Sequence, residues 1–154
     1  MISLAAATTL TEWSKRTLWR RISDGTVARL EDASAREKVK IPFDAIRSYA
    51  CIPLAEQDIA LIEQADSGDA QAQTELATIF LTYGKVESAI YWLKLAVKQD
   101  HATAMYILGR CYTDGNGIDR NCDLGIMWIA NAASAGHLVA QAQMAAMCSS
   151  LIGA

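Results

Sequence analysis

The stretch AMYILGRCYTDGNGIDRNCDLGIMWIANAASAG, residues 104–136, decides the fold because it recurs along the chain. Its first half matches residues 72–84 with an offset of 32 residues, and its second half matches residues 92–100 with an offset of 36. The difference of four residues lies in a longer loop at 114–119. A third copy starts at residues 140–148. Self-similarity at this period is typical of a repeat array.

Each repeat unit places small and large apolar residues at helical spacing, which predicts a helix, a turn, a second helix and a short break. The small residues allow two helices to approach closely, and the large residues fill the space between them. Because one such pair cannot bury its apolar face alone, neighbouring pairs stack into a solenoid. The small positions are Ala77, Ala96, Gly109 and Ala132, and the large positions are Leu76, Phe80, Trp92, Leu108, Tyr112 and Trp128.

The repeat pattern over about residues 69–148 resembles Sel-one-like repeats, which are close relatives of tetratricopeptide repeats. The resemblance implies that residues 69–154 form two full repeats and a partial third. It also implies a concave surface, formed by the first helix of each unit, that binds a peptide or helix of a protein partner. The tetratricopeptide pattern places eight residues on that surface: Gln71, Thr74, Thr78, Leu81, Thr103, Tyr106, Arg110 and Thr113.

The third unit lacks its second helix, so its apolar stripe has no following cover. Terminal units of an array normally present a polar face, and an uncapped end is adhesive. We expect residues 139–151 to dock a protein partner or to self-associate as a homodimer, with Met144 and Met147 in the contact. The alternative is that the stripe packs on the preceding unit. It contains Ala140, Met144, Met147, Cys148 and Leu151.

Residues 51–68 form a candidate capping and linker segment. Pro53 suits the first turn of a helix, and the pattern predicts a helix over residues 54–65. We expect this helix to cap the solenoid and to join it closely to the preceding residues.

The first 50 residues differ from the remainder in charge and composition. The 154-residue chain is 52% hydrophobic and carries a formal net charge of −3, which excludes disorder. Residues 1–50 hold nine Lys and Arg against six Asp and Glu, whereas residues 51–154 hold five against eleven. This asymmetry predicts two modules, the first a candidate for binding a polyanion.

The N-terminal module is predicted to combine helices with a small β-hairpin. Ser3 can cap a first helix through Leu10, and Ser14 can cap a second helix that Gly25 ends. Alternating residues at 26–30 and 36–41 predict two strands, and Pro42 ends the second. A further short helix begins near Asp44.

This order resembles the MerR/excisionase-type winged helix-turn-helix over about residues 3–49, on the basis of residues 14–25, the hairpin that ends at 39–42, and residues 44–46. The resemblance implies duplex DNA binding, with the second helix in the major groove and the hairpin wing on phosphates. The alternative is that the same fold contacts protein. The implied DNA-binding residues are Lys15, Arg16, Arg20 and Arg21 on the helix, and Arg29, Arg36, Lys38 and Lys40 on the wing.

No catalytic, metal or cofactor site is expected. His101 and His137 occupy the same phase of the repeat, which explains them as repeat-start residues. The four cysteines lack metal-ligand spacing and are predicted to be buried small hydrophobes. The chain has no P-loop, no dinucleotide glycine pattern and no plausible nucleophile with a base. Polar residues interrupt its longest uncharged stretch, residues 124–154, so no membrane span is expected.

We therefore expect a mainly α-helical protein: an N-terminal winged helix-turn-helix over residues 1–50, a capping helix over 51–68, and a solenoid of helical hairpins over 69–154. The expected function is that of a cytoplasmic, bacterial, non-enzymatic regulatory adaptor that binds DNA through the winged helix and protein through the repeats. The alternative is a scaffold that binds protein through both modules and never binds DNA.

Overall fold

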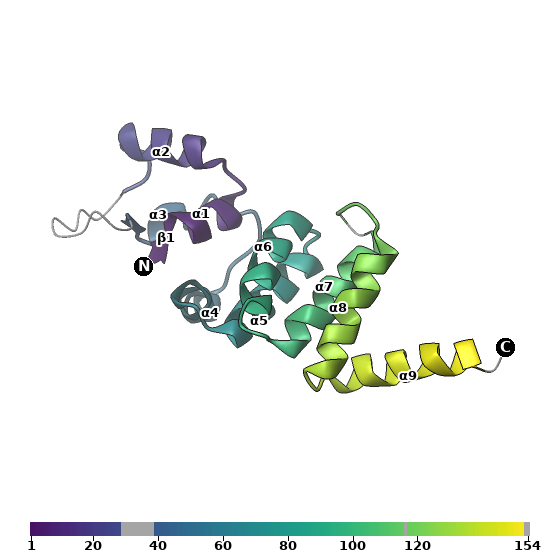
Figure 1. The fold of residues 1–154 in the computed structure, drawn as a ribbon. Coiled ribbons are helices and arrows are strands. Elements are labelled where there is room, and N and C mark those ends of the chain that lie inside the picture. The colour runs from purple at the N-terminus through teal and green to yellow at the C-terminus, as the bar shows by residue number, and fades with distance from the viewer. Residues whose placement is uncertain (29–38, 116, 153–154) are drawn as a thin grey trace.

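The computed structural model describes residues 1–28, 39–115 and 117–152, and shows helices that succeed one another from an N-terminal head to a C-terminal helix (Figure 1). Two short strands belong to the head. In chain order the elements are β1 (Ile2–Ser3), α1 (Leu4–Thr11), α2 (Lys15–Ser23), β2 (Lys40–Ile41), α3 (Asp44–Arg47), α4 (Glu56–Ser67), α5 (Ala70–Thr82), α6 (Val86–Val97), α7 (Ala102–Asp114), α8 (Cys122–Ser134) and α9 (Leu138–Ile152).

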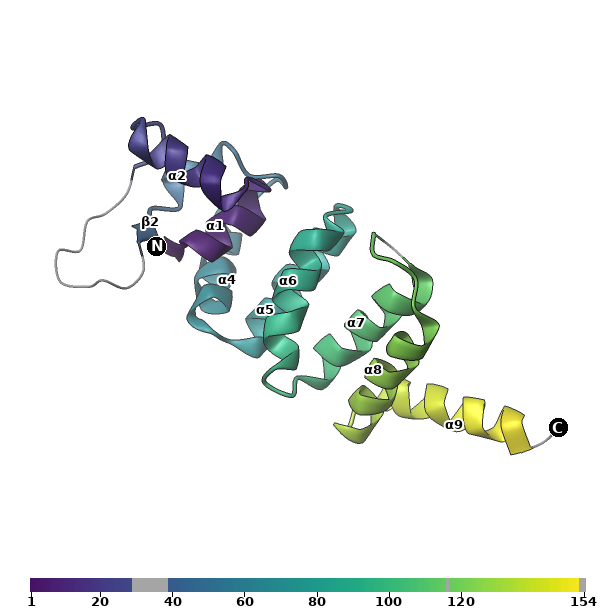
Figure 2. The same cartoon turned by 45° about the horizontal axis from the view of Figure 1, so that its top comes forward.

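Two helical hairpins, α5 with α6 and α7 with α8, lie side by side, and α9 follows the second (Figure 2). The division of residues 69–154 into two full repeats and a partial third stays a prediction. The second hairpin is closed most tightly where two glycines meet. A Cβ added to Gly109 would lie 2.8 Å from the Gly125 carbonyl oxygen and 2.7 Å from Ile129 Cγ1. Only glycine at position 109 lets α7 and α8 approach this closely.

The first helix of each repeat begins with the same device, a side chain that caps the helix. The Asp69 carboxylate accepts a hydrogen bond from the Ala72 N–H at 2.6 Å. His101 Nδ1 accepts from the Ala104 N–H at 3.4 Å, and His137 Nδ1 accepts from the Ala140 N–H at 3.2 Å. Such caps satisfy one of the free donors at a helix N-terminus. The two histidines are therefore repeat-start residues, as their spacing predicts.

One apolar core runs from the head through both hairpins. Its buried members include Ile2 and Leu10 in the head, Ile62 in α4, and Trp92 and Leu108 in the hairpins. A smaller cluster of Met105, Ile129, Ala132 and Ala140 lies between the second hairpin and α9. The head and the solenoid are thus packed as one body, although the predicted division at residues 50 and 68 stays a prediction.

The strand pairing of the head differs from the expected hairpin. Lys40–Ile41 pairs antiparallel with the N-terminal Ile2–Ser3, with Ile2 opposite Ile41. Residues 26–28, expected to begin a strand, are not in a strand, because Asp24 and Gly25 end α2 and Thr26 bonds back to the Asp24 carboxylate. The rest of the expected hairpin, residues 29–38, lies outside the described residues. What the structure shows is a helical head with a two-stranded sheet.

The head is fastened to the solenoid by polar contacts beside the shared core. Lys85 Nζ lies 2.7 Å from Glu12 Oε2, and the buried Ser88 hydroxyl donates to the Thr9 carbonyl at 2.9 Å. The contacts of Lys85 and Ser88 place α1 against α6, so the head covers the first end of the array. The Cys51 N–H donates to the Leu10 carbonyl at 2.7 Å and ties the segment after α3 to the end of α1.

The capping helix begins later than expected. α4 starts at Glu56, two residues after the predicted start, because the Asp58 carboxylate accepts the Ala55 N–H and sets the first turn there. α4 packs against α5, as a cap of the solenoid should.

Replacing Gly109 by Ala should destabilise the fold. The added Cβ forces α7 and α8 apart, and overpacking of this kind costs about 1–3 kcal/mol, which outweighs the gain of up to about 1 kcal/mol in helix propensity. Urea unfolding followed by circular dichroism measures the change. Thr103→Ala, at an exposed position of the same helix, is the matched control and should shift the free energy by less than about 0.5 kcal/mol. Equal stability of Gly109→Ala and the wild type would contradict the tight approach.

Candidate interaction surfaces

The exposed face of α5 carries a chain of hydrogen-bonded polar side chains. Gln71 Nε2 donates to Glu75 Oε1 at 2.7 Å, and Gln71 Oε1 lies 3.1 Å from His101 Nε2. Because His101 Nδ1 accepts from the α7 backbone, its Nε2 carries the hydrogen and donates to Gln71. The glutamine and histidine are therefore held in one orientation across the boundary between the first and second repeats.

The corresponding face of α7 carries an aromatic and a cationic group. The Tyr106 ring stacks on the His137 ring, with centroids 4.4 Å apart and planes 19° apart. Arg110 makes an ion pair with Asp114 at 3.1 Å and lies 3.5 Å from the Tyr106 hydroxyl. Hydrogen bonding to Tyr106 and to Asp114 raises the pKa of Arg110, so its charge is permanent. Tyrosine and arginine held in this way suit recognition of another protein.

Most of the eight residues expected on this surface lie on it, although not all are accessible. Gln71, Thr78, Thr103 and Arg110 are exposed. Tyr106 is half-buried under His137, and Leu81 is half-buried against the core.

Two of the eight residues point inward instead. Thr74 is 3% exposed, and its hydroxyl lies within hydrogen-bond distance of both the Ala70 carbonyl, at 2.8 Å, and His101 Nδ1, at 3.0 Å. The Thr113 methyl group packs where a Cβ on Gly125 would be, so it faces α8. Both stabilise the repeat rather than present a group to a partner.

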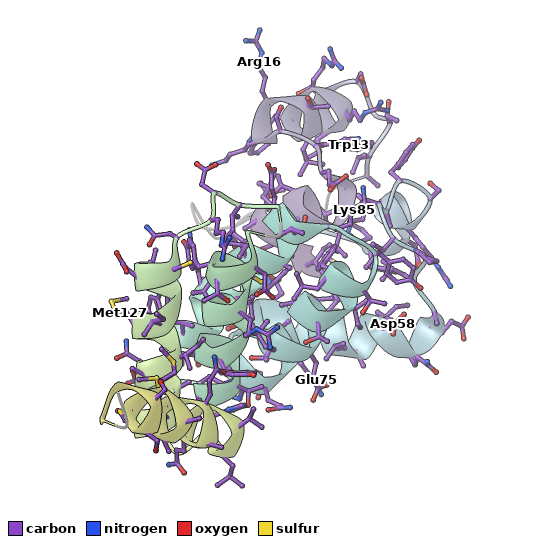
Figure 3. All side chains as sticks on the ribbon, turned by 90° about the vertical axis from the view of Figure 1, so that its right-hand side faces the viewer. Trp13, Arg16, Asp58, Glu75, Lys85 and Met127 are labelled. Atoms are coloured by element: carbon purple, nitrogen blue, oxygen red, sulfur yellow. The ribbon has the colours of Figure 1, made fainter. Side chains whose placement is uncertain are left out.

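Glu75, Asp114 and the two capping histidines were missed as members of this surface. Glu75 projects from α5 into solvent in Figure 3. Glu75 lies four residues after Gln71, and Asp114 lies four residues after Arg110. Because residues four apart meet on a helix face, this spacing is the sequence signal that indicates Glu75 and Asp114.

The last helix, α9, is only partly covered. Ala140 is buried and Met144 is half-buried in the cluster with Met105 and Ile129, so the stripe begins by packing on the preceding unit. Met147 is half-buried, and Cys148 is exposed. At the start of the helix, Leu138 and Val139 are 78% and 57% exposed. Docking or self-association through this helix stays a prediction.

The basic residues expected to contact DNA fall into distinct groups. Lys15, Arg16 and Arg20 are exposed on α2, and Figure 3 shows Arg16 directed away from the rest of the molecule. Lys40 is exposed on β2, where its Nζ lies 3.7 Å from Asp66. Arg29, Arg36 and Lys38 lie outside the described residues.

Arg21 differs from the other cations of α2. Its guanidinium lies 4.2 Å from the centroid of the Trp13 ring and 5.5 Å from that of Tyr49, and the two rings are themselves 4.9 Å apart. Its Nε is buried. Arg21 therefore joins α2 to the residues that follow α1 and α3, and its contact with a duplex stays a prediction.

The cysteines divide into two kinds. Cys111 is buried and Cys51 half-buried, and burial is the main cause that raises the pKa of each thiol. Cys122 and Cys148 are exposed, because their helices pack through other faces, so the prediction of burial fails for them. In the described part of the chain, no helix is both long and apolar enough to cross a bilayer.

Removing the Arg21 guanidinium should destabilise the head, whereas removing that of Arg20 should not. Arg21→Gln loses the cation–π contacts with two rings and should lower the free energy of unfolding by about 1 kcal/mol. Arg20→Gln, one residue earlier and exposed, should change it by less than about 0.5 kcal/mol. Thermal unfolding of both variants measures the difference. Equal effects would show that Arg21 has no structural role.

Comparison with known proteins identifies the repeats. The Sel1 repeat family matches residues 70–101 and 102–137, which are the two helical hairpins. The crystal structure of a Sel1 repeat protein from Oxalobacter formigenes is similar, with 34% sequence identity and a TM-score of 0.51 over 56% of this chain and 68% of that chain. No curated protein matches the chain. With both hairpins matched by the family and a Sel1 repeat protein of 34% identity matched over 68% of its length, the chain belongs to the Sel1 repeat proteins.

Proposed function

We propose that this chain is an adaptor that holds a peptide or helix of a partner protein on the face formed by α5 and α7. The observation that carries the proposal is that two clusters of side chains on that face are held in place by their neighbours. One is the hydrogen-bonded chain of Glu75, Gln71 and His101. The other is the Tyr106 ring stacked on His137, with Arg110 beside it.

The chemistry of this face suits a polypeptide. Glu75 and Gln71 offer acceptors, Arg110 offers donors, and Tyr106 offers an aromatic ring, so backbone and side-chain groups of a partner can both be satisfied. Since these side chains are already held by their neighbours, little conformational entropy is lost when a partner binds. Leu138 and Val139 directly follow His137, which stacks on Tyr106, and both are exposed, so they add apolar area.

Truncating the α7 side of this face should release the partner. The test is a co-purification from native lysate, treated with nuclease, with the purified chain as bait. Tyr106→Ala with Arg110→Ala should reduce recovery of the bound partner by roughly tenfold or more, because Tyr and Arg dominate interface energetics. Asp123→Ala, exposed on α8, is the control and should retain the partner. Loss of the partner with Asp123→Ala but not with the double variant would place the binding surface elsewhere.

A second candidate function is binding of duplex DNA through α2. Lys15, Arg16 and Arg20 are exposed on one helix that projects from the molecule, which favours contact with phosphates or guanine edges. The head would then carry a regulatory role, with the repeats recruiting a protein to DNA. If DNA is not bound, the same helix would serve a protein partner.

A mobility-shift experiment with random-sequence duplex tests whether α2 binds DNA or serves only a protein partner. A DNA-binding head should lose affinity steeply as salt rises, and Arg16→Ala with Arg20→Ala should abolish the shift. Lys94→Ala with Lys98→Ala removes the same number of charges from α6 and is the matched control. A shift that survives the α2 double variant, or that only the α6 variant removes, would contradict the assignment to α2.

A further inference from the structure

A groove of about 730 Å³ lies where the head meets the solenoid. Its walls come from β1, α1, α2, β2, α4, α5 and α6, so it exists only because the head is packed against the repeats. Sites of this size, between two packed modules, are where proteins commonly hold small ligands.

Much of the groove lining is apolar. Leu4 of α1, Val39, and Tyr91, Trp92 and Leu95 of α6 supply this part of it. Each of these side chains also packs in or against the core, so their positions are fixed by the fold. A ligand with an apolar body would therefore enter a site that is already shaped.

The polar groups of the groove are dominated by cations. Asp66, the one acid of its lining in the described residues, is satisfied internally, because its carboxylate accepts from the N–H of Ser3 at 2.7 Å and from the Ser3 hydroxyl. Its side chain is 7% exposed, whereas that of Lys40, 3.7 Å away, is 47% exposed. Lys15 also lines the groove. The side chains of Lys15 and Lys40 are exposed, whereas the Asp66 carboxylate is buried.

Tyr91 adds a donor beside these cations. Burial, with the charge of Asp66, raises the pKa of the Tyr91 hydroxyl, so it stays protonated at neutral pH. A protonated phenol can donate to an oxygen anion. The lining therefore offers apolar side chains, two ammonium groups and one hydroxyl donor.

We propose that this groove binds a small amphipathic acid, whose apolar body lies on Tyr91, Trp92 and Leu95 and whose carboxylate lies by Lys15 and Lys40. A cationic ligand is disfavoured because both lysines would repel it, while Asp66 is shielded by Ser3. Because the ligand touches the head and the solenoid together, it should also stabilise the joint between them.

Three ligands with the same apolar tail test the charge requirement. Octanoate, octan-1-ol and octylammonium are titrated separately into the full chain by isothermal titration calorimetry. Octanoate should bind best, roughly tenfold tighter than octan-1-ol, because a hydrogen-bonded charge pair is worth about that factor. Octylammonium should bind least. Equal binding of all three, or no binding of octanoate at millimolar concentration, would overturn the proposal.

Variants at Ala5 test whether octanoate binds in the groove. Ala5 is exposed, lines the groove and lies in the first turn of α1, where an acidic residue is compatible with the helix. Ala5→Glu should weaken octanoate binding by roughly tenfold or more, and Ala5→Gln, of similar bulk, should weaken it less. Unchanged affinity in Ala5→Glu would show that octanoate binds elsewhere.

The lysine that carries the charge is tested in the same way. Lys40→Gln should weaken octanoate binding by roughly three- to tenfold and leave octan-1-ol binding unchanged. Lys94→Gln, exposed on α6 outside the groove, is the control and should bind octanoate as the wild type does. An equal loss in both variants would mean a general charge effect and would overturn the site.

Discussion

The structure depends on one constraint: a helical hairpin with apolar faces cannot bury them within itself. Each hairpin here is completed by a neighbour. α5 and α6 pack between α4 and α7, and α8 packs against α7 and α9. The head obeys the same constraint, since α1 lies on α6, and Leu10 of α1 and Ile2 of β1 join the core of the repeats. The head is thus the N-terminal cap of the array as well as a separate surface.

The two ends of the array differ because of this capping. At the first end, polar contacts such as Lys85 with Glu12 and Ser88 with Thr9 accompany the apolar packing. At the other end, α9 packs on α8 and on Met105 of α7, and this last helix begins with the exposed Leu138 and Val139 and has no charged residue. The apolar side chains of the array are therefore covered better at the end next to the head than at the C-terminal helix.

The repeats could be predicted from the sequence because their determinants are local and recur. The spacing of Leu76 and Leu108, the glycine at 109 and the shared phase of His101 and His137 lie within single units. The surface residues were predicted less well. The tetratricopeptide pattern identifies which face of α5 carries Thr74, but it does not show that the hydroxyl turns to Ala70 and His101.

The head could not be predicted to the same depth because its contacts join distant residues. Ile2 pairs with Ile41 across most of the module, and Arg21 is held between Trp13 and Tyr49. Neither partner is visible from periodicity, which reports only on neighbours three or four residues apart. The lining of the groove at the joint comes from seven elements that are distant in the sequence, so no local sequence pattern indicates it.

Sharing one core has a consequence for how the head and repeats can act together. The exposed face of α2 and the face of α5 and α7 are fixed to the same buried residues, so a movement of one relative to the other would break packing at α1 and α6. Interiors packed to this density switch between discrete arrangements and do not deform continuously. Two partners bound to these faces are accordingly held in one relative orientation, which raises the effective concentration of each for the other. Only a group that enters the joint itself, where α1, β2 and α6 meet, could bias that orientation.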